Sequence, residues 1–224
     1  MKLVILSDTH GQHADSRLNR ELLDIFNQDP DSVLIHCGDV SGRGFIWEIE
    51  MFVEWYDSLP FKHKIFIAGN HDFSFEESPD FTNDILKDIG KSIIYLQDSG
   101  ITIDGVNFWG SPVQPRFYDW AFNRDEDIQN HWDLIPDSTN VLITHGPPHG
   151  ILDKTKRENK NVGCPMLLNK IKNLSDLRVS AFGHIHEASG IQDDFLDLPG
   201  VIFVNGSFLD LSYKPVNSPY IIEI

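Results

Sequence analysis

Short hydrophobic runs that end in polar residues recur along the chain. Five of them lie at residues 3–6, 33–35, 65–68, 141–143 and 179–182. Continuous hydrophobic runs of this length are typical of β-strands covered on both faces. We therefore predict five buried strands in the interior of the fold.

Two segments between these runs have the spacing of amphipathic helices. The hydrophobic positions of the first are Leu18, Leu22, Ile25 and Phe26. Those of the second are Phe45, Ile49, Phe52 and Tyr56. Residues with this spacing share one helix face. Strands that alternate with helices indicate an α/β fold, with function at the carboxyl ends of the strands.

The second half of the chain also contains signals for antiparallel strands. Asp104 and Gly105 separate two alternating runs within residues 101–110, which predicts a tight hairpin. Residues 202–207 and 220–224 predict two late strands. We therefore expect a mixed α/β (α+β) fold with two packed sheets under outer helices. No repeat or linker divides the chain, so we expect one domain spanning residues 1–224.

The charge balance limits the partners. The 224 residues include 34 acidic and 18 basic side chains, for a formal net charge of −16. Nucleic-acid and membrane-surface proteins depend on basic patches, so we expect no stable complex with either. A small phosphate substrate stays compatible, because bound metal ions can reverse the local sign of the charge.

The sequence also predicts a compartment. Cys37 and Cys164 form no close pair, so no disulfide framework is expected. The hydrophobic run near the start is too short for a signal peptide, and no later run approaches a membrane span. We expect a cytoplasmic protein without a membrane segment.

Polar side chains that can bind metal follow all five predicted buried strands. In chain order they are Asp8, His10, Asp39, Asn70, His71, His145, His184 and His186. Mixed oxygen and nitrogen donors suit Mn²⁺, Fe or Zn²⁺. Side chains two residues apart on an extended segment point the same way, so one ion can take both. The set is too large for one ion and fits two ions that share a carboxylate.

Each residue also has an ordinary structural explanation when it is taken alone. A single histidine is commonly structural or exposed, Asp8 could cap a helix, and Asn70 could form a turn. The recurrence at five strand ends favours the metal site. Four further histidines do not fit this pattern and receive no ligand role: His13, His36, His63 and His131.

The blocks "SDTHG", "CGDV…GRG", "GNHD", "THGPPHG" and "GHIH" resemble those of the calcineurin-like metallophosphoesterases, in the same order, from residue 4 to about residue 207. The stretches "FWGSPVQPRFYDWAFN" and "LITHGPPHGILD" are similar to one branch, the metallophosphoesterase-domain proteins known from brain and their bacterial relatives. The resemblance implies a four-layer αββα sandwich with a binuclear metal centre.

The resemblance also implies a role for each ligand. The first ion would be held by Asp8, His10, Asp39 and His186, and the second by Asp39, Asn70, His145 and His184. Asp39 would bridge the two ions. Some members of the branch have a small residue at the last histidine position, which weakens their metal site. This chain retains His186, so we expect a competent site.

His71 matches a family histidine that contacts phosphate and helps the leaving group, and Arg43 matches an arginine directed at the phosphate. Many phosphatases of this superfamily have Asp-Arg-Gly where this chain has Gly-Arg-Gly, at residues 42–44. The missing aspartate normally orients the histidine. Either another group such as Asp72 orients His71, or His71 acts more as a phosphate ligand than as an acid.

Three segments near the motifs have both a functional and an ordinary interpretation. His149 could donate to substrate from the rim, with Asn70 as a second contact, or it could be an exposed turn residue. The basic segment 153–163 could be a flap that attracts an anionic substrate, or a solvated loop. The aromatic stretch 116–123 could stack a nucleobase, or pack as a small core under a loop.

These observations predict a phosphohydrolase with two divalent ions, of which Mn²⁺ is the expected metal and Fe or Zn²⁺ are alternatives. The expected substrate is a small phosphoester or nucleotide, and the branch resemblance favours a phosphodiesterase on compounds such as cyclic nucleotides. The alternatives are a phosphomonoesterase, a nuclease, or a catalytically weak nucleotide-binding scaffold. The natural substrate and the oligomeric state cannot be predicted from the sequence.

Overall fold

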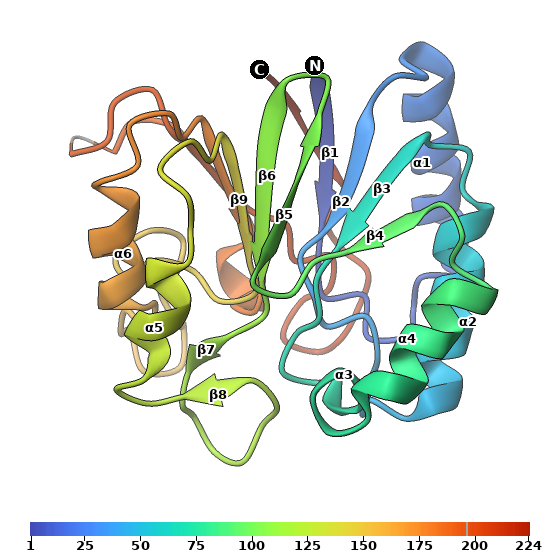
Figure 1. Cartoon of the computed structure of the whole chain (residues 1–224), viewed down its shortest axis with the longest axis horizontal. Coiled ribbons are helices and arrows are strands. Elements are labelled where there is room, and N and C mark those ends of the chain that lie inside the picture. Colours follow the sequence, from blue (N-terminus) through green and yellow to red (C-terminus); the bar gives the residue numbers. More distant parts are fainter. Residues whose placement is uncertain (196) are drawn as a thin grey trace.

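The computed structural model describes residues 1–195 and 197–224. Two large sheets stand face to face, and helices cover their outer faces (Figure 1). The first sheet has five strands in the order β13-β1-β2-β3-β4, and the second has six in the order β11-β12-β10-β9-β6-β5. Both sheets mix parallel and antiparallel pairs, as expected from the sequence.

The first sheet is built from the first half of the chain and closed by its last strand. Its strands are β1 (Lys2–Leu6), β2 (Val33–His36), β3 (His63–Phe66), β4 (Ile93–Tyr95) and β13 (Tyr220–Glu223). Only β13 runs antiparallel to its neighbour. The helices on this side are α1 (Ser16–Gln28), α2 (Ile46–Ser58), α3 (Phe73–Glu77) and α4 (Pro79–Asp88).

The second sheet contains the antiparallel hairpin and the later parallel strands. Its strands are β5 (Ser99–Ile103), β6 (Val106–Ser111), β9 (Val141–Thr144), β10 (Val179–Phe182), β11 (Gly190–Gln192) and β12 (Ile202–Asn205). Helices α5 (Ile128–Asp133) and α6 (Pro165–Ile171) lie outside it. The short pair β7 (Gln114–Pro115) and β8 (Asn123–Arg124) and the single turn η1 (His186–Ala188) complete the elements.

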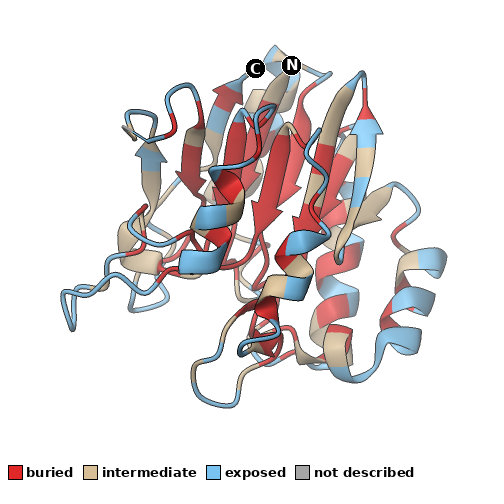
Figure 2. Ribbon diagram, turned by 60° about the vertical axis from the view of Figure 1, so that its left-hand side comes forward, coloured by how far each residue is buried: buried red, intermediate tan, exposed pale blue. Residues whose placement is uncertain are grey.

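The core explains why the predicted strands are hydrophobic at nearly every position. Along β1, Leu3 and Ile5 pack between the two sheets, whereas Val4 and Leu6 pack under the helices of the first sheet. Figure 2 shows the central strands buried along almost their whole length. Since both faces of each central strand are covered, both sets of alternating side chains are apolar.

The predicted hairpin is confirmed. Asp104 and Gly105 connect β5 to β6, and both have positive φ angles, of 48° and 81°. A two-residue turn with this backbone matches the twist of antiparallel strands. Its position fixes the register in which Ile103 pairs with Val106.

The prediction for the second helix is wrong at Phe45. Phe45 immediately precedes α2 in an extended conformation, and its side chain is 52% exposed. Its ring stacks on Trp47, and the buried face of the helix begins at Ile49. The hydrophobic spacing alone could not reveal that the helix starts at residue 46.

The carboxyl ends of the parallel strands meet at one edge of the two sheets, the lower edge in Figure 1. A bridge between Ser7 and Ser207 joins the first sheet to the second at this edge. The loops after five strands of different sheets are therefore held close together. Among the described residues, no helix is both long and apolar enough to cross a membrane.

Candidate metal centre

All seven predicted metal ligands lie at this edge. Their side chains form groups whose nitrogen and oxygen atoms come within 4.8 Å of one another. One group is Asp8, His10 and His186, and another is Asp39, His145 and His184. Asn70 adjoins the second group, because its side-chain oxygen lies 2.9 Å from Nε2 of His145. The convergence predicted from the strand ends is therefore present.

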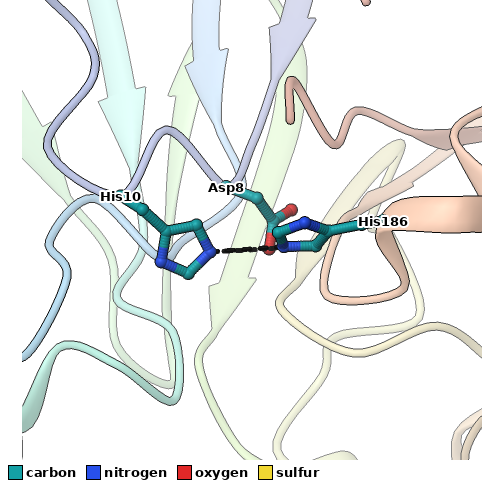
Figure 3. Close-up of side chains that lie close together, drawn as sticks. All are labelled: Asp8, His10 and His186. Atoms are coloured by element: carbon teal, nitrogen blue, oxygen red, sulfur yellow. Dashed lines mark hydrogen bonds and ion pairs between the residues drawn. The ribbon is translucent and has the colours of Figure 1, made fainter. Parts of the chain in front are cut away.

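The first group brings together residues from the first and the last of the five motifs. Nε2 of His10 and Nε2 of His186 are 3.2 Å apart and face each other beside the Asp8 carboxylate (Figure 3). Oδ1 of Asp8 lies 3.4 Å from Nε2 of His186 and 4.0 Å from Nε2 of His10. Two imidazole nitrogens and a carboxylate oxygen thus point at one position.

Asp39 lies between the two groups. Its Oδ2 atom is 3.5 Å from Nε2 of His10, and its Oδ1 atom is 3.4 Å from Nε2 of His145. The same Oδ1 accepts a 2.8 Å hydrogen bond from the main-chain N–H of His71. One carboxylate therefore faces both histidine clusters with different oxygen atoms.

The loops that hold these ligands have unusual backbone conformations. Asp8, His10, Asp39 and His184 all have positive φ angles, between 43° and 69°. Residues other than glycine adopt a positive φ angle at a cost of about 1 kcal/mol or more each. Neighbouring glycines make room, since a Cβ atom at Gly183 would collide with Ser7 and Asp8.

Three of the candidate ligand histidines are oriented by main-chain carbonyl groups. The Nδ1 atoms of His10, His145 and His186 lie 3.2, 2.9 and 3.1 Å from the oxygens of Ser41, Cys37 and Asp210. A carbonyl oxygen only accepts, so each Nδ1 carries the proton. When such a ring is neutral, its Nε2 lone pair faces the cluster, which is the arrangement that metal sites require.

The Asp8 carboxylate is also held by hydrogen bonds from a main-chain N–H group and a serine hydroxyl. It accepts hydrogen bonds from the main-chain N–H of His184, at 3.0 Å, and from the hydroxyl of Ser207, at 2.8 Å. Burial would raise the pKa of Asp8, but the hydrogen bond and charge of His186 outweigh it and lower the pKa. Asp8 is therefore ionised and fixed in place.

In the absence of a cation, the pKa values of two of the candidate ligand histidines are raised and those of two others are lowered. Burial would lower the pKa of His145, but the charge of Asp39 outweighs it and raises the pKa to about 9. The hydrogen bond to Asp8 likewise overcomes burial and raises the pKa of His186 to about 9. Burial lowers the pKa of His10 to about 4 and that of His184 to about 3.

The donor set fits two divalent cations. Each group offers two imidazole nitrogens and a buried carboxylate, and Asn70 adds an amide oxygen to the second. The Nε2 atoms of His10 and His186 face each other at 3.2 Å, where only a proton or a cation can lie between them favourably. Nitrogen and oxygen donors of this kind suit Mn²⁺, Fe and Zn²⁺ alike.

His71 lies beside the cluster, and the structure shows what orients its ring. Nδ1 of His71 is 2.7 Å from the main-chain oxygen of Gly42. The His71 ring also stacks on the ring of Trp120, with centroids 4.2 Å apart and planes at 29°. No pattern in the sequence indicates either contact, because one partner is a backbone atom and the other lies in a distant loop.

The suggestion that Asp72 orients His71 is wrong. The fully buried Asp72 carboxylate instead accepts hydrogen bonds from the main-chain N–H groups of Val40, Ser41 and Gly69, at 3.1, 2.9 and 2.8 Å. The Ser41 hydroxyl adds a fourth at 2.6 Å. Asp72 ties the loop after β2 to the loop after β3.

The other predicted contact residues lie farther out. Arg43 is exposed and lines a small cavity beside His71, not the main cavity over the cluster. His149 is exposed and lines none of the cavities beside the cluster. Segment 153–163 has four basic residues, Lys154, Lys156, Arg157 and Lys160, of which only Arg157 lines the main cavity. The base of that segment is fixed by the buried carboxylate of Asp153.

The aromatic stretch 116–123 is divided between the core and the main cavity. Ala121 and Phe122 are buried in the core under the helices of the first sheet. Phe117, Tyr118 and Trp120 instead line the main cavity. His13, His36, His63 and His131 belong to none of the clusters found among the described residues.

Comparisons with known proteins agree with this architecture. Residues 1–188 match the calcineurin-like phosphoesterase family. The human "Metallophosphoesterase domain-containing protein 1" is 36% identical over 246 residues, which cover 100% of this chain and 71% of the human protein.

Two solved structures share the fold at low sequence identity. TT1561 of Thermus thermophilus has a TM-score of 0.62 at 13% identity, covering 94% of this chain and 90% of that one. Phosphopantetheinyl Hydrolase from Mycobacterium tuberculosis has a TM-score of 0.51 at 15% identity, covering 92% and 88%.

Two packed sheets with histidine and carboxylate clusters at their strand ends define a metallophosphoesterase fold. The chain belongs to the calcineurin-like phosphoesterase family. Membership makes it a phosphoesterase of the hydrolase class. It also implies a binuclear divalent metal centre, for which the two groups provide candidate ligands.

Proposed function

We propose that this protein is a phosphodiesterase that hydrolyses small phosphoesters, such as cyclic nucleotides, with two divalent metal ions. The observation that carries the proposal is the position of Asp39, whose two oxygens face separate histidine clusters 3.5 and 3.4 Å away. A carboxylate placed in this way can be shared by two cations.

We assign the ligands as the family resemblance implies. Asp8, His10, Asp39 and His186 hold the first ion, and Asp39, Asn70, His145 and His184 hold the second. The geometric groups around Asp8 and around Asp39 support this division. Mn²⁺ is the proposed metal. Since the ligands come from both sheets, we propose that residues 1–224 act as one domain.

When bound, the two cations lower the pKa of water enough to supply a nucleophile near neutral pH, and they neutralise the phosphoryl oxygens. The protein contributes orientation. Main-chain carbonyls fix three imidazole rings, and Asp39 is held by the N–H of His71. A phosphate can therefore bind in one geometry with little reorganisation.

His71 is the proposed proton donor to the leaving oxygen. Its Nδ1 proton points to Gly42, so Nε2 is the nitrogen available to the cavity over the cluster. A proton held at Nε2 stabilises the charge that develops on the departing oxygen. Arg43 is the proposed second contact for substrate charge, from the small cavity beyond His71.

A binding scaffold with a vestigial centre is the alternative from a different class. Vestigial sites lose ligands, and this chain retains all seven in a converged arrangement. The arrangement therefore supports the hydrolase.

The test is hydrolysis of bis-p-nitrophenyl phosphate with added Mn²⁺ by the wild type, His186→Ala and Asp39→Ala. We expect losses of about 10³-fold or more in kcat for Asp39→Ala. His63→Ala is the matched control, because His63 lies outside the clusters. Equal rates for all four proteins would favour the scaffold. Parallel assays with p-nitrophenyl phosphate and single-stranded DNA separate phosphomonoesterase and nuclease activity from diester hydrolysis.

A further inference from the structure

Three cavities meet at the metal centre. The main cavity, of about 720 Å³, is lined by Asp39, Asn70, His71 and His184 among others. A second cavity, which we call the lobe, has a volume of about 800 Å³. A third, the side pocket, has a volume of about 420 Å³.

The lobe and the side pocket adjoin different ends of the main cavity. The lobe shares His184 with the main cavity and does not include His71. The side pocket shares His71 and does not include His184. A phosphate bound over the metal groups therefore has a cavity on its His184 side and another on its His71 side.

The lobe has the lining of a site for an organic group. Its walls include the apolar side chains of Pro115, Phe117, Pro147, Val162, Ile185 and Leu211. Arg157 and Glu187 line both the lobe and the main cavity, so one positive and one negative side chain lie where the two meet. Apolar walls with a few polar groups are typical of small-molecule sites.

We infer that the lobe binds the organic group that stays on the phosphorus during hydrolysis, and that it favours a flat, largely apolar group. This inference rests on the proposed function. If His71 protonates the leaving oxygen, the leaving group departs on the His71 side, toward the side pocket. The retained ester group must then occupy the His184 side, which is the lobe.

The assignment explains why a diester suits this site. An acyclic phosphodiester has two separate organic groups, and the protein offers one cavity for each. A phosphomonoester would leave the larger of the two unfilled. Arg157 contributes charge near the phosphate, whereas the apolar walls select the retained group.

The experiment compares two diesters with the same leaving group and different retained groups. They are bis-p-nitrophenyl phosphate, which retains an aryl group, and methyl p-nitrophenyl phosphate, which retains a methyl group. The variant is Val162→Trp, because Val162 lines the lobe but not the main cavity and is 43% exposed. The readout is the ratio of kcat/KM for the aryl ester to that for the methyl ester.

We expect Val162→Trp to lower this ratio by about tenfold, as partial filling of a hydrophobic site does. The matched control, Lys154→Ala in the same segment, should keep the wild-type ratio, since Lys154 lines none of the three cavities. The ratio is independent of the folded fraction. Thr155→Trp, at a second lobe position outside the main cavity, repeats the test if the first variant is inactive.

An unchanged ratio in both lobe variants would overturn the inference. The ratio would also stay unchanged if the leaving group occupied the lobe, because the hydrolysis of both esters would then slow equally. Failure of the proposed function looks different. In that case the wild type with Mn²⁺ hydrolyses neither ester.

Discussion

Nδ1 of His71 lies 2.7 Å from the main-chain oxygen of Gly42, the residue at the sequence position where the family resemblance leads us to expect an aspartate. A carbonyl group fixes the ring and its tautomer without adding a negative charge. His71 therefore keeps its orientation although the Asp-Arg-Gly aspartate is replaced by Gly42.

Replacement of His71 should separate chemistry from metal binding. We expect His71→Ala to lower kcat for bis-p-nitrophenyl phosphate about 100-fold, the usual contribution of a positioned acid. Manganese content, measured by elemental analysis, should stay at the wild-type level. His71 also lies in a potential ligand group with His10 and Asp39. A parallel loss of metal would therefore identify it as a ligand.

Trp120 should act through the orientation of His71. Aromatic stacking contributes about 0.5–1.5 kcal/mol, so Trp120→Ala should lower kcat by up to about tenfold. Trp120→Phe retains an aromatic face and should recover most of the rate. Steady-state kinetics of both variants provide the measurement. Equal effects of alanine and phenylalanine would show that stacking on His71 does not matter.

Asp72 should be important for stability. Its removal leaves three buried main-chain N–H groups without an acceptor. Each unsatisfied group costs about 1–3 kcal/mol, so Asp72→Ala should lower the free energy of unfolding by about 3 kcal/mol or more. Urea denaturation followed by circular dichroism measures the change. Asp72→Asn keeps one acceptor oxygen, so its free energy of unfolding should fall less than that of Asp72→Ala.

Metal binding should release protons. The pKa values of His145 and His186 are raised to about 9, so both rings are protonated at pH 7 in the metal-free protein. His10 and His184, with pKa values of about 4 and 3, are already neutral. Binding of two Mn²⁺ ions at pH 7 should therefore release about two protons. Calorimetric titration in two buffers of different ionisation enthalpy counts them.

Two variants check this proton count. His186→Ala should reduce the release to about one proton, whereas His184→Ala should leave it unchanged while weakening metal binding. The affinity for Mn²⁺ should rise as pH increases from 6 and level off above pH 9, because fewer protons must then be displaced. A pH-independent affinity would contradict the raised pKa values.

The same two histidines affect the stability of the metal-free protein. Their pKa values in the folded chain lie above the ordinary value of 6.5. They therefore stabilise the fold fully below pH 6.5, and this contribution is lost as pH rises through about 9. The melting temperature of the metal-free protein should fall over that range, and His145→Ala should flatten the curve.

The sequence was sufficient to predict the sheets and the convergence of the candidate ligands, because both depend on local signals. A hydrophobic run followed by Asp, Asn or His marks a strand end, and parallel strands bring such ends together. The five runs correspond to β1, β2, β3, β9 and β10. The hairpin at Asp104 was equally predictable, since its turn residues are specific.

Contacts around the ligands could not be predicted in this way. The partners of His10, His145 and His186 are backbone oxygens, which any residue type provides. Trp120 and Asp72 carry side chains that fit several roles, and only the packing of distant loops decides between them. The aromatic stretch 116–123 was recognised, but its division between core and cavity depends on the path of the loop.

Asp8, His10, Asp39 and His184 have left-handed backbone conformations, which lower thermal stability at the same positions that supply the metal-binding atoms. Glycine would relax these loops and strengthen the bare chain, yet it would remove the donor atoms. A library of variants of this protein that is screened only for heat resistance would accumulate glycine at these positions. The selected variants would then no longer bind the cations. Only a screen that also demands turnover would keep these four residues.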